Sequence, residues 1–230
     1  MFFDPVYLLF ALPGVLLSMW ASYRVRVAFG AYSLVPASHG YTGAEAAQKL
    51  LDDAGLHDVG IVETEGYLSD HYDPMSRQLA LSIGVYHGRS LASIGVACHE
   101  AGHAIQHATG YAPLGLRSLL VPTANIGSTV GYVVIMVGLM LSPWIVLLGA
   151  GVFSMVLLFQ IVTLPVEFDA TARAKRLVVE AGIIEPWERG GMDKVLNAAA
   201  LTYVAAAVST LMVLAYFLFS AGLLGGGRDE

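Results

Sequence analysis

Hydrophobic positions gather in four long apolar runs that are separated by two polar stretches. The runs cover residues 5–23, 119–141, 144–164 and 195–224, and Ser142-Pro143 separates the second run from the third. Each run is long enough for an α-helix to cross a bilayer core of about 30 Å. Glycine, serine and threonine interrupt the second run, and such small residues let helices approach closely in lipid. The pattern predicts four membrane-spanning helices, with the second and third forming a tight hairpin.

The polar stretch after the first run predicts a small water-exposed domain. Thr42 and Glu45 have the spacing of a capping box, and an apolar stripe follows them until Gly55. Short segments rich in strand-forming residues cover 59–64, 67–72 and 77–82, and the last two flank the turn sequence Asp73-Pro74-Met75-Ser76. These segments predict a small sheet that precedes a helix. The sheet either only covers that helix or offers an edge to which an extended peptide adds.

The predicted helix after the sheet contains His99-Glu100-Ala101-Gly102-His103, an H-E-x-x-H sequence. Ser90 provides an N-cap and Gly110 a stop signal for this helix. His99 and His103 are four residues apart and therefore share a face on which both can bind one metal ion. Glu100 is turned by about 100° from His99, so it can reach a metal-activated water without binding the metal. A chance match on a buried helix is the alternative, but the helix signals favour a zinc site.

Catalytic zinc needs a third protein ligand. His107 is excluded, because a rise of about 1.5 Å per residue separates it from His99 by about 12 Å. It contacts a metal ligand, faces the substrate, or is a core histidine near the membrane interface. Glu167 follows Pro165 at the end of the third apolar run, where a cation would offset the cost of a carboxylate near the membrane. The alternative is that Glu167 only stabilises the start of a helix at Pro165. Asp169 points about 200° away from Glu167, so it pairs with Arg173 or accepts a hydrogen bond from a ligand histidine.

Composition and charge support a membrane protein. Hydrophobic residues make up 56% of the chain and charged residues only 13%, and the net charge of −6 has no run that would indicate nucleic-acid binding. Arg24 and Arg26 follow the first run, which favours a retained anchor over a cleaved signal peptide. All 12 Lys and Arg residues except Arg228 lie in the two polar stretches, so the positive-inside rule predicts that these face the cytoplasm. The single cysteine, Cys98, excludes an intrachain disulfide.

Three blocks of sequence resemble the YugP-like family of neutral zinc metallopeptidases, which are integral-membrane proteins of bacteria. The blocks are Ser69–Pro74, Cys98–His107, and Leu164–Ala170 with the later Leu196–Tyr203. The layout is also similar to gluzincins, in which a Glu on a later helix completes H-E-x-x-H. The resemblance implies His99, His103 and Glu167 as ligands of one Zn²⁺ per chain, with Glu100 as the catalytic base. Those proteases commonly carry an Asp four residues after the ligand Glu, and this chain has Thr171 there.

The expected fold class is therefore a mainly α, integral membrane protein with a zincin-like catalytic domain inserted between spans 1 and 2. The expected divisions are span 1 (1–24), the metallopeptidase region (25–112), the hairpin of spans 2 and 3 (113–164), a third-ligand helix and loop (165–194), and span 4 with a tail (195–230).

The expected function is a membrane-anchored zinc endopeptidase of the bacterial inner membrane. Its partners are a polypeptide substrate and the lipid bilayer, without nucleic acid. His71, Tyr72 and Arg173 are candidate donors to the oxyanion of the reaction. Two alternatives remain open at this stage: a protease that cleaves within the membrane, and a non-catalytic membrane scaffold or chaperone.

Overall fold

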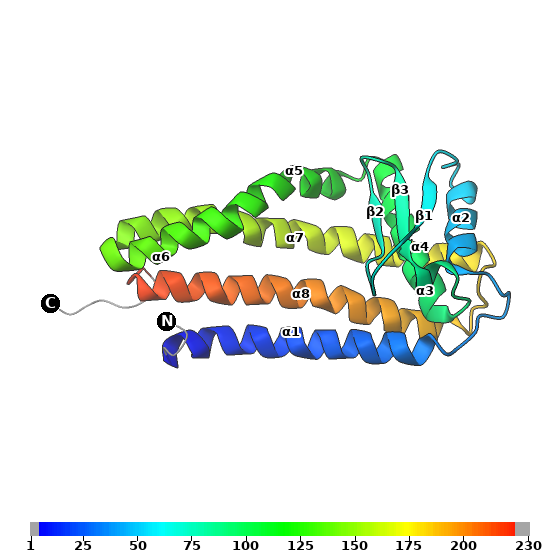
Figure 1. Cartoon of the computed structure of the whole chain (residues 1–230), viewed down its shortest axis with the longest axis horizontal. Helices are drawn as coiled ribbons and strands as arrows, with labels where there is room; N and C mark the ends of the chain where they lie inside the picture. Colours follow the sequence, from blue (N-terminus) through cyan, green and yellow to red (C-terminus); the bar gives the residue numbers. More distant parts are fainter. Residues whose placement is uncertain (1–4, 224–230) are drawn as a thin grey trace. The chain divides into compact units, whose positions relative to one another are not determined.

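A computed structural model describes residues 5–223, and helices dominate them (Figure 1). The elements in chain order are α1 (Pro5–Tyr32), α2 (Gly43–Asp53), β1 (Gly60–Thr64), β2 (His71–Asp73), β3 (Gln78–Ser82), α3 (Ile83–Tyr86), α4 (Leu91–Ala108), α5 (Ala112–Ile126), the π-helical η1 (Gly127–Gly131), α6 (Tyr132–Leu141), α7 (Pro143–Glu180) and α8 (Arg189–Ser220). The prediction of a mainly helical chain with a small sheet is confirmed.

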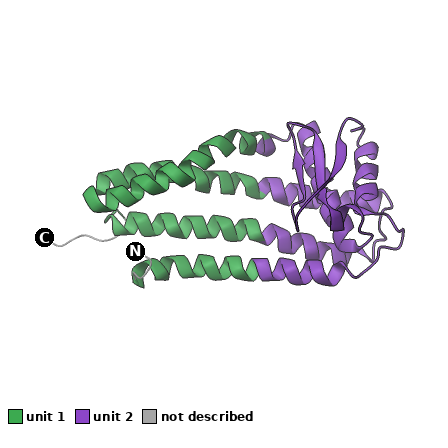
Figure 2. Cartoon of the chain, in the orientation of Figure 1, with its two compact units in different colours: residues 1–21, 115–164, 202–230 green, residues 22–114, 165–201 purple. Residues whose placement is uncertain are grey.

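The chain divides into two compact units, which Figure 2 shows in green and purple. Unit 1 consists of residues 1–21, 115–164 and 202–230, and unit 2 of residues 22–114 and 165–201. Unit 1 contains most of the apolar runs, and unit 2 contains most of the polar stretches. Each unit has its own hydrophobic core.

Four helical segments among residues 5–223 are long and apolar enough to cross a membrane. They are Pro5–Tyr32, Ala112–Leu141, Pro143–Glu180 and Arg189–Ser220. The number of candidate spans agrees with the prediction, but the helices extend further into the polar sequence than the apolar runs do. The last helix starts at Arg189 and not near Val195, and Leu224, at the end of the fourth run, lies outside the described residues.

Glycines of η1 and α6 bring these two helices close to α7 in unit 1. A Cβ on Gly138 would lie 2.5 Å from the backbone nitrogen of Val146, and one on Gly131 would lie 2.7 Å from that of Phe153. Ser142 adopts an extended conformation and ends α6, and Pro143 starts α7. The predicted hairpin is thus confirmed, and its helices pack at a distance that no larger side chain would allow at these glycines.

The predicted helix start at Pro165 is wrong, because α7 continues without interruption from Pro143 to Glu180. Proline cannot donate a hydrogen bond to the carbonyl four residues earlier. A long helix in an apolar setting tolerates this loss when neighbouring groups compensate for it. Glu167 therefore lies in the interior of a helix, and the positive end of a helix dipole, which acts within the first turn, cannot account for it.

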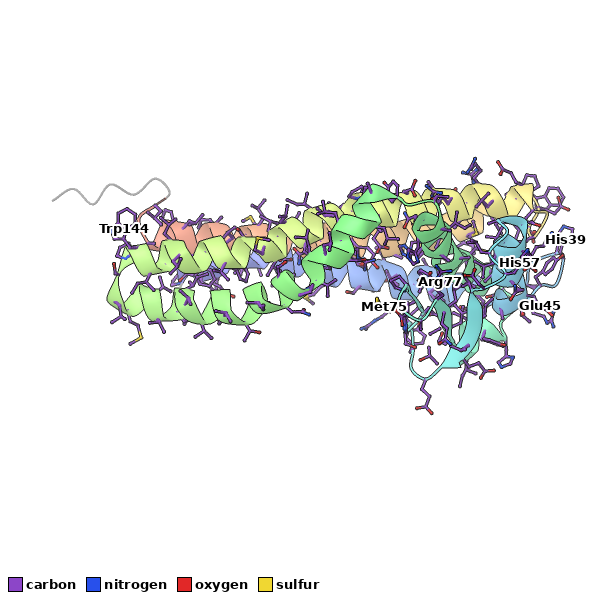
Figure 3. The ribbon with its side chains drawn as sticks, turned by 90° about the horizontal axis from the view of Figure 1, so that it is seen from above. His39, Glu45, His57, Met75, Arg77 and Trp144 are labelled. Atoms are coloured by element: carbon purple, nitrogen blue, oxygen red, sulfur yellow. The ribbon has the colours of Figure 1, made fainter. Side chains whose placement is uncertain are left out.

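A three-stranded sheet in unit 2 packs beside α4 (Figure 1). β3 is central, pairing in parallel with β1 and antiparallel with β2. The two strands predicted on either side of the turn at Asp73–Ser76 are present as β2 and β3, and β2 is shorter than expected. Asp73 accepts hydrogen bonds from the Met75 backbone and the Ser76 hydroxyl at 2.8 and 2.6 Å, which closes the turn. Met75, labelled in Figure 3, is 92% exposed at its tip.

The helix α2 supports α4 from within unit 2. Its predicted capping box is present: the Glu45 backbone N–H donates to the Thr42 hydroxyl at 3.1 Å, and the Thr42 backbone N–H donates to the Glu45 carboxylate at 2.7 Å. Leu50 and Leu51 of α2 are buried in the same core as Ile94 of α4. Apolar burial of this kind, worth about 1.5–3 kcal/mol for a large aliphatic side chain, holds the histidine-bearing helix in place.

Candidate metal centre

The helix α4 begins and ends where the sequence predicts. The Ser90 hydroxyl accepts the backbone N–H of Ser93 at 3.1 Å, and Gly110 adopts a positive φ of 62° just beyond the helix. Most of α4 is buried, including Cys98, and burial raises the pKa of its thiol. Cys98 is thus a small core residue, and His99 and His103 are carried by a largely buried helix.

Gly102 allows α4 to contact α7 through their backbones. A Cβ at this position would lie 2.9 Å from the carbonyl oxygen of Ala170. That distance is shorter than real Cβ contacts, so any side chain would force the two helices apart. Gly102 is the third of the three residues between the two histidines of H-E-x-x-H. It thus determines how close Glu167 on α7 comes to the histidines.

The structure brings His99, His103 and Glu167 together. One ligand atom from each of them lies within 4.8 Å of the others. His99 Nε2 is 3.2 Å and His103 Nε2 is 3.6 Å from Glu167 Oε2. The Glu167 side chain is only 1% exposed, and a buried carboxylate is costly unless positive charge or donors surround it. The three donors could hold one metal ion.

The other ring nitrogen of each histidine has its own partner. His103 Nδ1 lies 3.0 Å from Gln106 Oε1, and His99 Nδ1 lies 3.3 Å from the hydroxyl of Thr171. Histidines that bind metals usually donate their second N–H to such a group, which fixes the ring orientation. Thr171 therefore contacts a candidate ligand histidine.

Charge around His103 favours its protonated form. Burial lowers its pKa, but the hydrogen bond that His103 donates to Glu167 and the negative charges of Glu100 and Glu167 outweigh burial, and the pKa is raised above the ordinary value. The same negative groups attract any cation at this point. The negative charge at this point is therefore compatible with a bound cation.

Glu100 lies beside the ligand cluster and does not belong to it. Its residue is 8% exposed, and its carboxylate forms no hydrogen bond or ion pair with any residue of the described range 5–223. A group that accepts protons from a transient water needs free lone pairs of this kind. Glu100 therefore lies outside the group formed by His99, His103 and Glu167, and its carboxylate has no partner among the described residues.

The remaining candidates lie around the cluster in different roles. His107 is exposed and pairs with the Tyr72 hydroxyl at 2.8 Å, so the expectation of a core histidine is wrong. Asp169 pairs with Arg173, as predicted, at 2.5 Å. The expected direct hydrogen bond between Asp169 and a ligand histidine is absent among the described residues. Gln106 lies between Asp169 and His103 and contacts both. The ring of His71 contacts the backbone of Ser69 at 2.8 Å.

Sequence reasoning named Gly102 and Thr171 but predicted no contact for them, and it did not single out Gln106. Gln106 follows His103 by three residues and so lies on the same side of α4, which is a signal that was present in the sequence. Its partners on α7 are about 60 positions away, and no local pattern predicts them.

Comparison with known proteins agrees with this geometry. The profile of the family described as "Putative neutral zinc metallopeptidase" matches residues 7–222. This chain belongs to that family. It is also 46% identical over 216 residues to the "Putative membrane protease YugP" of Bacillus subtilis (strain 168), covering 93% of this chain and 94% of the relative. No solved structure matches the chain.

Proposed function

We propose that this protein is a membrane-anchored zinc endopeptidase, with the catalytic residues in unit 2. The observation that carries the proposal is the convergence of His99, His103 and Glu167 with a free carboxylate, Glu100, on the same helix as the histidines. Family membership and the apolar helices support the same function. A scaffold protein would not need this arrangement.

The residues of the cluster fit zinc. Two imidazole nitrogens and one carboxylate oxygen are a ligand set that catalytic zinc uses, and three protein ligands leave one coordination position open. The outward ring nitrogens of His99 and His103 have partners, so each ring directs Nε2 toward Glu167. When bound, the ion would make a water molecule more acidic and polarise a peptide carbonyl.

Glu100 performs the proton transfers in this proposal. Its carboxylate accepts a proton from the attacking water and then delivers that proton to the amine that leaves the cleaved peptide bond. Its partial burial and its lack of partners within the described chain favour this role. The outer groups Gln106 and Thr171 hold the histidines during these steps.

The sheet offers a place for the substrate chain. β2 forms an edge of the sheet and packs beside α4. An extended peptide adds to such an edge through main-chain hydrogen bonds. We propose that polypeptide substrate binds along β2, which would bring its backbone toward the helix that carries Glu100.

Replacement of Glu100 by Gln tests the catalytic proposal. The amide cannot accept the proton, and general-base catalysis is typically worth about 10²–10⁴-fold, so peptide cleavage falls at least about 100-fold. Zinc content stays at about one ion per chain, because Glu100 is not a ligand. Purified Glu100→Gln protein is compared with wild type and with Glu65→Gln, an exposed carboxylate of the same unit. Unchanged cleavage by zinc-loaded Glu100→Gln protein would show that a group other than Glu100 acts as the base.

We also propose that unit 2 faces the cytoplasm of a bacterial cell and that its larger part, residues 25–112, is inserted between the first two spans. The basic residues near the spans, including Arg24, Arg26 and Arg117, support this orientation through the positive-inside rule. A reporter inserted near Gly66 should be cytoplasmic, and one fused after Glu230 should be extracytoplasmic. Reversed reporter signals would reject the orientation and leave the metal site untouched.

A further inference from the structure

We propose that Gln106 is a positioning residue that selects the metal-binding nitrogen of His103 and ties the histidine helix to the backbone beside Glu167. The inference rests on the proposed zinc site and concerns how that site is held in shape. Gln106 is completely buried, which is unusual for a side chain with an amide oxygen and an amide nitrogen that both need hydrogen-bond partners. All of its polar atoms have partners.

The partners settle which way the Gln106 amide points. Gln106 Nε2 lies 2.8 Å from the carbonyl oxygen of Val166 and 2.8 Å from Asp169 Oδ2. A carbonyl and an ionised carboxylate only accept hydrogen bonds. The amide nitrogen, with its two N–H groups, must therefore face α7, since an amide oxygen in that place would meet two acceptors in a buried site. The amide oxygen then faces His103.

This orientation determines the tautomer of His103. Gln106 Oε1 can only accept, so His103 Nδ1, 3.0 Å away, must carry a proton and donate it. A neutral imidazole then has its lone pair on Nε2, the nitrogen that faces Glu167 at 3.6 Å. Gln106, which is itself uncharged, thus orients His103 so that the metal-binding lone pair of His103 faces the other two proposed ligands.

The same side chain joins the two helices of the site. Val166, whose carbonyl Gln106 binds, directly precedes Glu167 on α7. Asp169, the second acceptor, is held in turn by Arg173 at 2.5 Å. A chain of hydrogen bonds therefore runs from Arg173 through Asp169 and Gln106 to His103, and one amide connects ligands that lie on different helices.

Replacement of Gln106 by Leu tests the proposal through zinc affinity. Leu fills a similar volume but cannot accept from His103 or donate to α7. Loss of such an outer partner typically weakens metal binding by about 10–100-fold, and we expect a loss in this range by competition with a chelator. The control Ile94→Ala removes buried volume from the same helix without touching this network. It should lower the melting temperature while leaving zinc affinity within about twofold of wild type.

The outcomes separate the inference from the function on which it rests. If wild type binds no zinc, the proposed function fails. If wild type binds zinc and folded Gln106→Leu binds it within about twofold, Gln106 is only structural and the inference fails. Zinc binding that is about 10–100-fold weaker in Gln106→Leu than in wild type, together with unchanged zinc affinity in Ile94→Ala, supports the inference.

A measurement on the wild-type protein covers the case in which Gln106→Leu does not fold. Nitrogen NMR of ¹⁵N-histidine-labelled, zinc-loaded protein distinguishes a protonated ring nitrogen from a metal-bound one. We expect His103 to carry its proton on Nδ1 and the metal on Nε2, with assignment by loss of the signal in His103→Ala. A metal-bound Nδ1 would overturn the proposal, because that nitrogen could not donate to Gln106.

Discussion

Among the helix pairs that approach each other at glycines, α6 with α7 and α4 with α7 use the close approach differently. In unit 1, Gly138 of α6 lies against the backbone of Val146 on α7. In unit 2, Gly102 of α4 lies against the backbone of Ala170, also on α7. The contacts in unit 1 are apolar, so they contribute packing alone, whereas those in unit 2 are flanked by hydrogen-bonded polar side chains. Close approach of helices at a glycine thus stabilises unit 1, whereas in unit 2 it sets the spacing of the candidate ligands.

The largest expected effect comes from removing the ligand that α7 supplies. Glu167→Ala leaves two histidines on one helix, and two donors hold zinc poorly. Zinc affinity should fall by more than about 100-fold, beyond the range expected for outer partners, and the bound metal should be lost on dialysis. Metal analysis of the purified protein measures this. The control Glu180→Ala, an exposed carboxylate on the same helix, should keep about one zinc per chain; full zinc content in Glu167→Ala protein would exclude Glu167 as a ligand.

A smaller effect should separate the two glycine contacts. A Cβ at Gly102 meets Ala170 at 2.9 Å, and one at Gly131 meets Phe153 at 2.7 Å. Overpacking typically costs about 1–3 kcal/mol, partly offset by the better helix propensity of Ala, worth about 1 kcal/mol, so both Ala variants should melt at lower temperature. Only Gly102→Ala should also weaken zinc binding, by roughly 10-fold, the size of effect seen when ligand orientation is disturbed.

Gly151→Ala is the matched control for these variants, because a Cβ there meets nothing within 4 Å. Its melting temperature should not fall. Equal zinc affinity in Gly102→Ala and Gly131→Ala would show that the spacing of α4 and α7 does not govern the site.

The smallest expected effect lies in unit 2 but away from the metal. Thr42→Ala removes the acceptor for the Glu45 backbone N–H and should cost about 1 kcal/mol of stability. Zinc affinity should stay within about twofold, since α2 supports α4 only through apolar packing. Thr42→Ser retains a hydroxyl and should restore most of the lost stability in thermal unfolding. A large loss of zinc in Thr42→Ala would mean that helix stability and ligand geometry are not separable in this unit.

Local patterns were sufficient for the parts of the molecule that depend on near neighbours. His99, Glu100 and His103 lie within one helical turn or little more, so their relative directions follow from helix geometry. The caps at Ser90 and Thr42 likewise depend on residues three positions away. The four apolar helices follow from composition, because a lipid core requires a long run of apolar residues.

Contacts between distant parts of the chain required the tertiary structure. The sequence singled out Glu167, but as the start of a new helix at Pro165, whereas the fold places it inside α7 and against His99, 68 positions away. Gln106 and Thr171 appear in the site only because α4 and α7 touch at Gly102, and their partners there lie 60 to 72 positions distant. The sequence by itself determined which side chains α4 presents, since helix geometry is local. The packing of α4 against α7 decided which groups meet them, since that packing depends on close contacts between residues far apart in the chain.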